Sequence, residues 1–291
     1  MSDFLTSIVF AAALLLSPVV SAQDDQRLVA GDSQFRFSSW DGPAFDAHVF
    51  VPDSVSAETT IVMVMHGFSR DIDRYFNDWR TQGEKHEFIV VVPHLDKETF
   101  PGSNEYNLGH VNDKESGERR PESLWTYSAI EPLFDEVVLR LGGRQTEYTL
   151  FGHSAGSQFV HRFLFFKPHA RVTRYIAANA GWYMMPDLSI GFPYGFKNSG
   201  LDERAFKTAF EKDVIVMLGT EDTDPNDPDL RQTEEALNQG LHRLQRGKNF
   251  IRFSSAQAEK NGSNLRWQLR LVEGAGHNNA AMAGAAAVLV D

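Results

Sequence analysis

Two hydrophobic patterns alternate along the chain. Short runs of consecutive apolar residues, typical of strands covered on both faces, occupy positions 59–65, 88–93, 148–151, 213–218 and 267–272. Amphipathic patterns between these runs predict helices over 71–86, 123–141, 155–166 and 229–245. Nearer the N-terminus, a turn at 41–43 separates the β-rich runs 35–40 and 45–51, which predicts a hairpin. Strands that alternate with helices predict an α/β fold with a mostly parallel central sheet and helices on both faces.

Two segments interrupt this alternation. Positions 96–120 are polar and rich in Gly, Asn and Glu, which predicts a long surface loop. Positions 181–200 mix aromatic residues with Pro and Gly, so we expect an ordered loop that either serves function or packs on the body of the domain. No repeat or break in composition divides the rest, and we expect residues 23–291 to form a single catalytic domain.

The N-terminus has the pattern of a secretory signal peptide. An unbroken apolar run at 8–16 is followed by Pro18 and by small residues up to Ala22, ahead of the polar Gln23. We therefore expect residues 1–22 to be a cleaved signal, and the mature protein to be secreted or periplasmic without stable membrane association. The first residues include Asp3 and no Lys or Arg, which leaves an uncleaved anchor or a buried N-terminal helix as alternatives.

Composition excludes several classes of protein. With 42% hydrophobic and 12% aromatic residues, the chain is neither disordered nor fibrous. The absence of cysteine excludes disulfides, thiolate metal sites and cysteine nucleophiles. The chain has 28 basic and 39 acidic residues, a net charge of −11, and this acidic balance argues against binding to nucleic acid.

A G-x-S-x-G motif at 152–156 is the strongest chemical signal. It directly follows the apolar run 148–151 and directly precedes a predicted helix, which is the setting of a nucleophile elbow. The glycines suit a turn in which backbone segments approach too closely for a Cβ atom. We expect Ser154 to be a nucleophile at the carboxyl edge of the sheet. We expect His153 to be a packing residue whose ring points away from the cleft.

A serine hydroxyl needs a histidine base that is itself oriented by a carboxylate. Of the ten histidines, His277 lies in a glycine-rich turn directly after the last apolar run, so its ring should reach the same edge of the sheet as Ser154.

Three carboxylates compete for the role of the acid, all of them following the run 213–218: Glu221, Asp222 and Asp224. Asp224 precedes a proline, which biases it towards an extended backbone, and the longer Glu221 should face solvent. The segment 222–226 also resembles the start of a calcium loop, but the loop's glycine and final glutamate are missing. We therefore expect no metal and no cofactor.

The order Ser…Asp…His is that of the α/β-hydrolases, and the chain resembles that superfamily from about Phe35 onward. The resemblance implies an α/β-hydrolase fold and the assignment of Asp222, three residues after Gly219, as the acid. The segment 66–68 looks like the family's His-Gly oxyanion motif. The resemblance therefore implies an oxyanion hole formed by the backbone N–H groups of Phe68 and Ala155.

Within the superfamily, the segments 179–183, 192–195 and 274–278 look similar to secreted esterases of the polyhydroxybutyrate-depolymerase-like branch, although the HGGG pattern of one lipase group is absent. We expect a serine hydrolase that cleaves small or polymeric carboxylic esters through an acyl-enzyme. Three aromatic residues are expected to bind the acyl group: Trp182, Tyr183 and Tyr194. The alternatives are a peptidase or amidase of the same fold, or a catalytically inactive binding protein.

Overall fold

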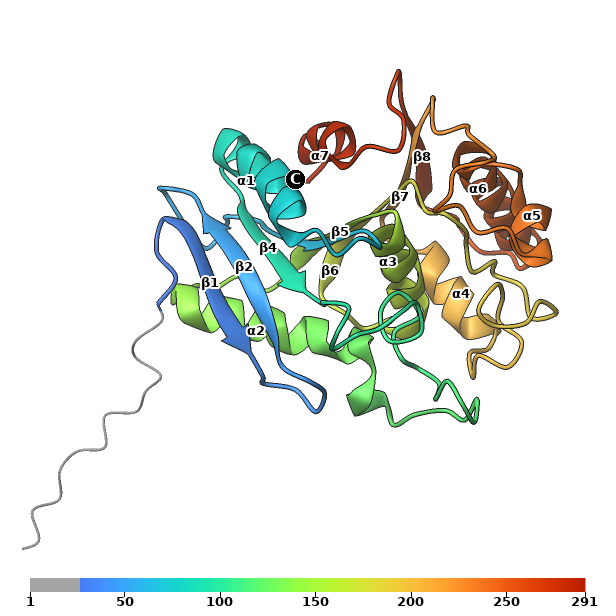
Figure 1. Ribbon diagram of the computed structural model, residues 1–291, viewed down its shortest axis with the longest axis horizontal. Helices are drawn as coiled ribbons and strands as arrows, with labels where there is room; N and C mark the ends of the chain where they lie inside the picture. The colour runs from blue at the N-terminus through green and yellow to red at the C-terminus, as the bar shows by residue number, and fades with distance from the viewer. Residues whose placement is uncertain (1–26, 291) are drawn as a thin grey trace, which may run out of the picture.

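The computed structural model describes residues 27–290, and the expected signal peptide at 1–22 lies outside that range. Eight strands form one sheet in the order β1-β2-β4-β3-β5-β6-β7-β8 (Figure 1). The strands are β1 (Gly31–Phe37), β2 (Phe45–Val51), β3 (Ile61–Met65), β4 (Ile89–His94), β5 (Tyr148–His153), β6 (Val172–Ala178), β7 (Val214–Gly219) and β8 (Trp267–Val272). The α-helices are α1 (Ile72–His86), α2 (Ile130–Leu141), α3 (Ala155–Phe166), α4 (Glu203–Phe210), α5 (Glu234–Gln239), α6 (Arg243–Lys260) and α7 (Asn279–Ala287).

The sheet is mostly parallel, as the alternation of patterns predicted. β1 and β2 form the expected antiparallel hairpin, and β2 also pairs antiparallel with β4. Every other pairing, from β4 through β3 and β5 to β8, is parallel. The carboxyl ends of β3, β5, β7 and β8 therefore meet at one edge, where the segments that follow them carry the expected site residues.

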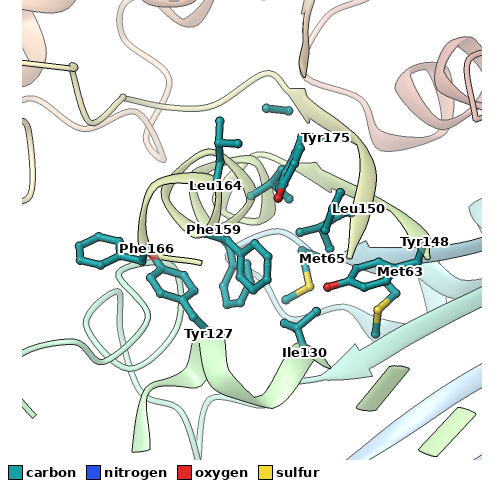
Figure 2. Close-up of a cluster of buried hydrophobic side chains, with 14 of the residues drawn as sticks. Met63, Met65, Tyr127, Ile130, Tyr148, Leu150, Phe159, Leu164, Phe166 and Tyr175 are labelled. Carbon is teal, nitrogen blue, oxygen red and sulfur yellow. The ribbon is translucent and has the colours of Figure 1, made fainter. Parts of the chain in front are cut away.

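Both faces of the sheet are covered, which explains the continuous apolar runs. In β3, Ile61 and Met63 belong to the hydrophobic cluster beneath α2, α3, α4 and α6, whereas Val62 belongs to the cluster beneath α1 and α7. Figure 2 shows part of the larger cluster, in which Met63 lies beside the ring of Tyr148. A strand buried on both sides needs apolar side chains at every position rather than at alternate ones.

Several elements differ from the sequence-based expectation. β6 was not predicted, because exposed and half-buried polar residues at its start hide the apolar run. α4 and the alanine-rich α7 were also missed. The prediction of one helix over 229–245 is wrong, because the segment forms parts of two helices. Thr233 caps the short α5, and Gly240, at φ 146°, separates α5 from the much longer α6. The helix expected over 123–141 begins as two short 3-10 turns and is α-helical only from Ile130.

The two long loops are ordered parts of the domain. Between 96 and 120 the chain makes successive turns, and the buried Tyr106 donates a hydrogen bond of 2.6 Å to the carbonyl of His66. The loop at 181–200 packs several aromatic side chains against the body of the domain. Over residues 27–290, none of the helices combines the length and apolar character needed to cross a bilayer.

Candidate active site

Ser154 stands on a sharp turn between β5 and α3. Its backbone has φ 59° and ψ −117°, a strained conformation for a residue other than glycine. The turn is possible because its neighbours lack side chains: a Cβ at Gly152 would overlap the carbonyl of Gly156, and a Cβ at Gly156 would overlap the carbonyl of Met65. This close packing holds the Ser154 side chain above the carboxyl edge of the sheet.

The structure brings the three expected catalytic side chains into one hydrogen-bonded chain. His277 Nε2 lies 3.0 Å from Ser154 Oγ, and His277 Nδ1 lies 2.7 Å from Asp222 Oδ2. Asp222 is almost completely buried, whereas His277 is about a quarter exposed and lines the cleft. A buried carboxylate of this kind fixes the tautomer and the direction of the imidazole.

The other two candidate acids are not part of this chain. Glu221 and Asp224 are both exposed. Asp224 uses one carboxylate oxygen to accept the backbone N–H of Asn226, which closes a local turn. Of the three carboxylates that follow β7, Asp222 is the one in contact with His277.

Asn179, at the end of β6, connects the loop of the acid to the loop of the base. Its side-chain oxygen accepts the N–H of Gly219 at 2.8 Å, and its amide nitrogen donates to the carbonyl of Gly276 at 3.2 Å. A second contact, from Glu221 N–H to the carbonyl of Ala275, joins the same two loops. Sequence reasoning missed Asn179, because its two partners lie 40 and 97 residues away.

Arg243, at the start of α6, is a second residue that sequence reasoning missed. It is 2% exposed, lies 3.4 Å from Asp222 Oδ1, and donates two hydrogen bonds of 2.9 and 3.1 Å to Asp227. The Arg243 guanidinium holds the pKa of Asp227 below its usual range. Asp222, the first residue of the calcium-like segment, and Asp227, the residue after that segment, are therefore both paired with a cation of the protein itself. Over residues 27–290, no three His, Asp or Glu side chains are grouped so as to hold a metal ion.

His153 packs as predicted, but its ring does not point away from the site. The ring centroids of His153 and His277 lie 4.6 Å apart, and the Nδ1 of His153 lies 2.9 Å from the hydroxyl oxygen of Tyr75. Burial lowers the pKa of His153 well below its ordinary value, so the ring is neutral. It therefore supports the His277 ring without placing a second cation beside it.

The backbone N–H groups expected to form an oxyanion hole belong to residues that line the same cleft. Ala155 is the first residue of α3, where an N–H has no partner within the helix and the helix dipole is positive. Phe68 follows β3 on a loop that is anchored through the buried His66, whose Nε2 accepts the N–H of Leu95. Burial lowers the pKa of His66 to about 3, which keeps this ring neutral as well.

The expected aromatic wall is only partly correct. Trp182 lines the cleft, whose volume is about 540 Å³. Tyr183 does not: its ring is fully buried and stacks on Phe250, with ring centroids 4.4 Å apart. Tyr194 lies behind Trp182, with ring centroids 4.6 Å apart, and also stays out of the cleft. The other residues near Trp182 on the cleft wall are mainly polar: Asn107, Gln158, Asp229, Leu230 and Arg231.

Known structures share this architecture over almost the whole chain. The poly(aspartic acid) hydrolase-1 from Sphingomonas sp. KT-1 is 40% identical, with a TM-score of 0.88, over 90% of this chain and 99% of that one. LpqC, a poly(3-hydroxybutyrate) depolymerase from Bordetella parapertussis, is 29% identical, with a TM-score of 0.84, over 89% of each chain. An S-formylglutathione hydrolase from Agrobacterium tumefaciens, at 15% identity and a TM-score of 0.54 over 90% of this chain and 94% of that one, shares the fold.

No protein-family model matches the chain, and no curated protein matches it either. The likeness to solved structures is nevertheless extensive, since it combines 40% identity with nearly complete coverage. The chain thus belongs to the α/β-hydrolase superfamily of serine hydrolases, in its polyhydroxybutyrate-depolymerase-like branch.

Proposed function

We propose that the protein hydrolyses carboxylic esters through an acyl-enzyme. The observation that carries the proposal is the continuous hydrogen-bonded chain from Ser154 through His277 to the buried Asp222, at the wall of an open cleft. Ser154 is the nucleophile, His277 the base and then the acid, and Asp222 the residue that orients the imidazole.

The reaction has two halves. In the first, Ser154 Oγ attacks the ester carbonyl while His277 Nε2 takes the hydroxyl proton, and the same nitrogen then protonates the departing alcohol. In the second, His277 removes a proton from water, the resulting hydroxide attacks the acyl-serine, and the proton returns to Ser154. In both halves the backbone N–H groups of Phe68 and Ala155 stabilise the oxyanion, each contributing about 3 kcal/mol in the transition state.

The substrate class supported by the cleft is a short or medium acyl ester, or an ester unit within a polymer. A volume of about 540 Å³ suits groups of this size, and Trp182 provides one flat apolar surface. A fluorophosphonate probe should label Ser154. Purified protein should hydrolyse 4-nitrophenyl acetate and butyrate, and failure of both tests would overturn the proposal in favour of an inactive binding protein.

A second candidate is the hydrolysis of amide bonds, favoured by the 40% identity to a protein named as a poly(aspartic acid) hydrolase. The same residues would serve, because His277 can protonate a departing amine as readily as an alcohol. Incubation with poly(aspartic acid) and with a polyester separates the two candidates. New amino groups indicate amide cleavage, and new hydroxyl groups indicate ester cleavage.

We also propose that residues 1–22 are a cleaved export signal and that residues 23–291 form one catalytic domain. The apolar run and the small residues before Gln23 support the signal. Expression of the full chain in a bacterial host with a signal peptidase should give a periplasmic or secreted product that starts at Gln23, as measured by intact mass. An intracellular product that keeps residue 1 would overturn this.

A further inference from the structure

Trp182 is flanked by guanidinium groups. The Cζ atom of Arg162 lies 4.0 Å from the centroid of the Trp182 ring, and the Cζ atom of Arg231 lies 4.9 Å from it. Arg246, on α6, donates a hydrogen bond of 2.6 Å to the carbonyl of Gly181, the residue before this tryptophan. Three cations are thus gathered behind and beside one wall of the cleft.

Two of these cations are buried without a carboxylate. Arg162 and Arg246 are both 0% exposed, and all their hydrogen bonds go to backbone carbonyl groups. Within residues 27–290, neither forms an ion pair. Burial lowers the pKa of each to about 10, so both remain charged at neutral pH. A buried charge without a counter-ion is costly and projects its field into the neighbouring cavity.

Arg231, which is exposed, brings a third guanidinium group to the surface of the cleft. Its Nε donates to the Tyr194 hydroxyl at 2.5 Å, and its two terminal nitrogens have no hydrogen-bond partner in the described part of the chain. The other two arginines of the cleft differ in this respect. Arg74 pairs with Asp71 at 3.4 Å, and Arg243 pairs with the carboxylates described above. Arg231 is therefore the cleft arginine that has no carboxylate partner in the described part of the chain, and both of its terminal nitrogens are available to a ligand.

The polar wall next to Trp182 offers further hydrogen-bonding groups. Asn107 Nδ2 donates to Gln158 Oε1 at 2.9 Å, which leaves the Gln158 amide nitrogen available as a donor. Both side chains are more than nine-tenths buried and both line the cleft. The oxygen of Asn107 is buried and has no partner in this part of the structure. A cleft for purely apolar acyl chains would not need such groups, because each costs free energy when it stays unpaired.

We propose that the surface around Trp182, with Arg231 as its contact residue, binds a carboxylate that the substrate carries close to its scissile carbonyl. The inference rests on the proposed function, because it concerns the same cleft, and it names the substrate class as carboxylate-bearing acyl compounds. A molecule with a net charge of −11 repels anions in general, so a cationic wall beside Ser154 selects for anions at this one place. The exposed Asp229 on the same cleft is the acidic group that opposes this preference.

Matched esters test the proposal. Monomethyl glutarate carries a free carboxylate, and dimethyl glutarate has the same chain without one. We expect kcat/KM for the monoester to exceed that for the diester by about tenfold, because one charge-assisted hydrogen bond contributes about the free energy that corresponds to this factor. A second pair, 3-acetoxypropanoate and its methyl ester, places the carboxylate on the leaving alcohol and shows on which side of the carbonyl it is bound. Equal or faster hydrolysis of the neutral ester in both pairs overturns the proposal.

Variants identify the residue responsible. Arg231→Gln should lower the ratio of the two kcat/KM values about tenfold, and Arg231→Lys should keep most of it, because the charge remains. Arg252→Gln removes the same charge from an exposed position on α6 away from the cleft and should leave the ratio unchanged. A ratio that survives in Arg231→Gln, or falls equally in Arg252→Gln, overturns the assignment.

A binding measurement separates this proposal from the proposed reaction. Calorimetry on the Ser154→Ala variant should give a Kd for glutarate at least about tenfold lower than for the neutral glutaramide. Tight glutarate binding without turnover of any ester would support the carboxylate site and overturn the proposed reaction. Ester turnover with no preference for glutarate would support the reaction and overturn the carboxylate site.

Discussion

The Asn179 side chain forms hydrogen bonds to two loops, one carrying Asp222 and the other carrying His277, which lie 55 residues apart in the sequence. The amide accepts from the segment leading to Asp222 and donates to the segment leading to His277, and the hydrogen bond from Glu221 N–H to the Ala275 carbonyl joins the same two loops. Buried amides with both ends paired are rigid, since each unmade hydrogen bond would cost about 1–3 kcal/mol. These contacts hold the two loops next to each other where Asp222 Oδ2 and His277 Nδ1 lie 2.7 Å apart.

Substitutions of two neighbouring carboxylates, Asp222 and Asp224, test which residue is the acid of the triad. Asp222→Asn should lower kcat by about four orders of magnitude, because the amide no longer holds the productive tautomer of His277. It should also lower Tm modestly, because Arg243 loses one of its two carboxylate partners. The exposed Asp224→Asn is the matched control and should change kcat by less than about tenfold. Ester hydrolysis and thermal unfolding of both variants measure this, and the reverse ranking in kcat would refute Asp222.

The nucleophile is tested by removing one oxygen. Ser154→Ala should fold normally, since the substitution leaves no cavity in the core, and should lose both fluorophosphonate labelling and nearly all ester hydrolysis. Circular dichroism and Tm serve as the control for folding. More than a few per cent of residual turnover by a homogeneous sample would contradict the assignment of Ser154.

At the scale of elements, local patterns predicted the β5–turn–α3 unit, because a short apolar run, two glycines and a helix are adjacent in sequence. The same patterns missed β6, whose Thr173 and Arg174 face partly outward, and misplaced the helices after β7, where Asp-rich turns precede Thr233. They also led to the wrong prediction that the Tyr183 side chain points into the cleft. Which way a loop side chain points depends on packing against distant segments, such as the ring of Phe250, and no local rule contains that information.

The burial of its aromatic side chains favours a fixed wall over a movable lid for the loop 181–200. Trp182, Tyr183 and Tyr194 are each at least nine-tenths buried, and moving the loop would expose all three. We therefore expect no interfacial activation: the rate on a long-chain ester should rise smoothly through the micelle threshold. A lipase with a known lid is the positive control, and a sharp jump in rate for this protein at the threshold would show that the loop opens.

At the scale of the whole molecule, three buried imidazoles couple stability to pH. Burial lowers the pKa of His66, His153 and His161, whereas each has an ordinary value near 6.5 in the unfolded chain. The unfolded state therefore binds more protons below pH 6.5, and stability falls as the pH decreases. The loss approaches about 1.4 kcal/mol per pH unit for each histidine.

Urea unfolding between pH 5 and pH 8 measures this dependence. We expect a nearly constant free energy of unfolding above pH 7 and a steep decrease below pH 6.5. His153→Gln should reduce the slope of the free energy of unfolding against pH by the amount that corresponds to about one proton. The exposed His169→Gln should not change it. A flat profile down to pH 5 would show that these rings gain protons in the folded state.

The order of strands in the sheet also has a consequence for synthesis. Ser154, the proposed nucleophile, follows the central strand β5, whereas His277, the proposed base, follows β8, which lies at the edge of the sheet and comes last among the described strands. A nascent chain that ends before residue 277 contains Ser154 but lacks the histidine that we propose as the general base. We therefore expect ester hydrolysis to begin only after β8 and the segment that carries His277 have joined the rest of the domain.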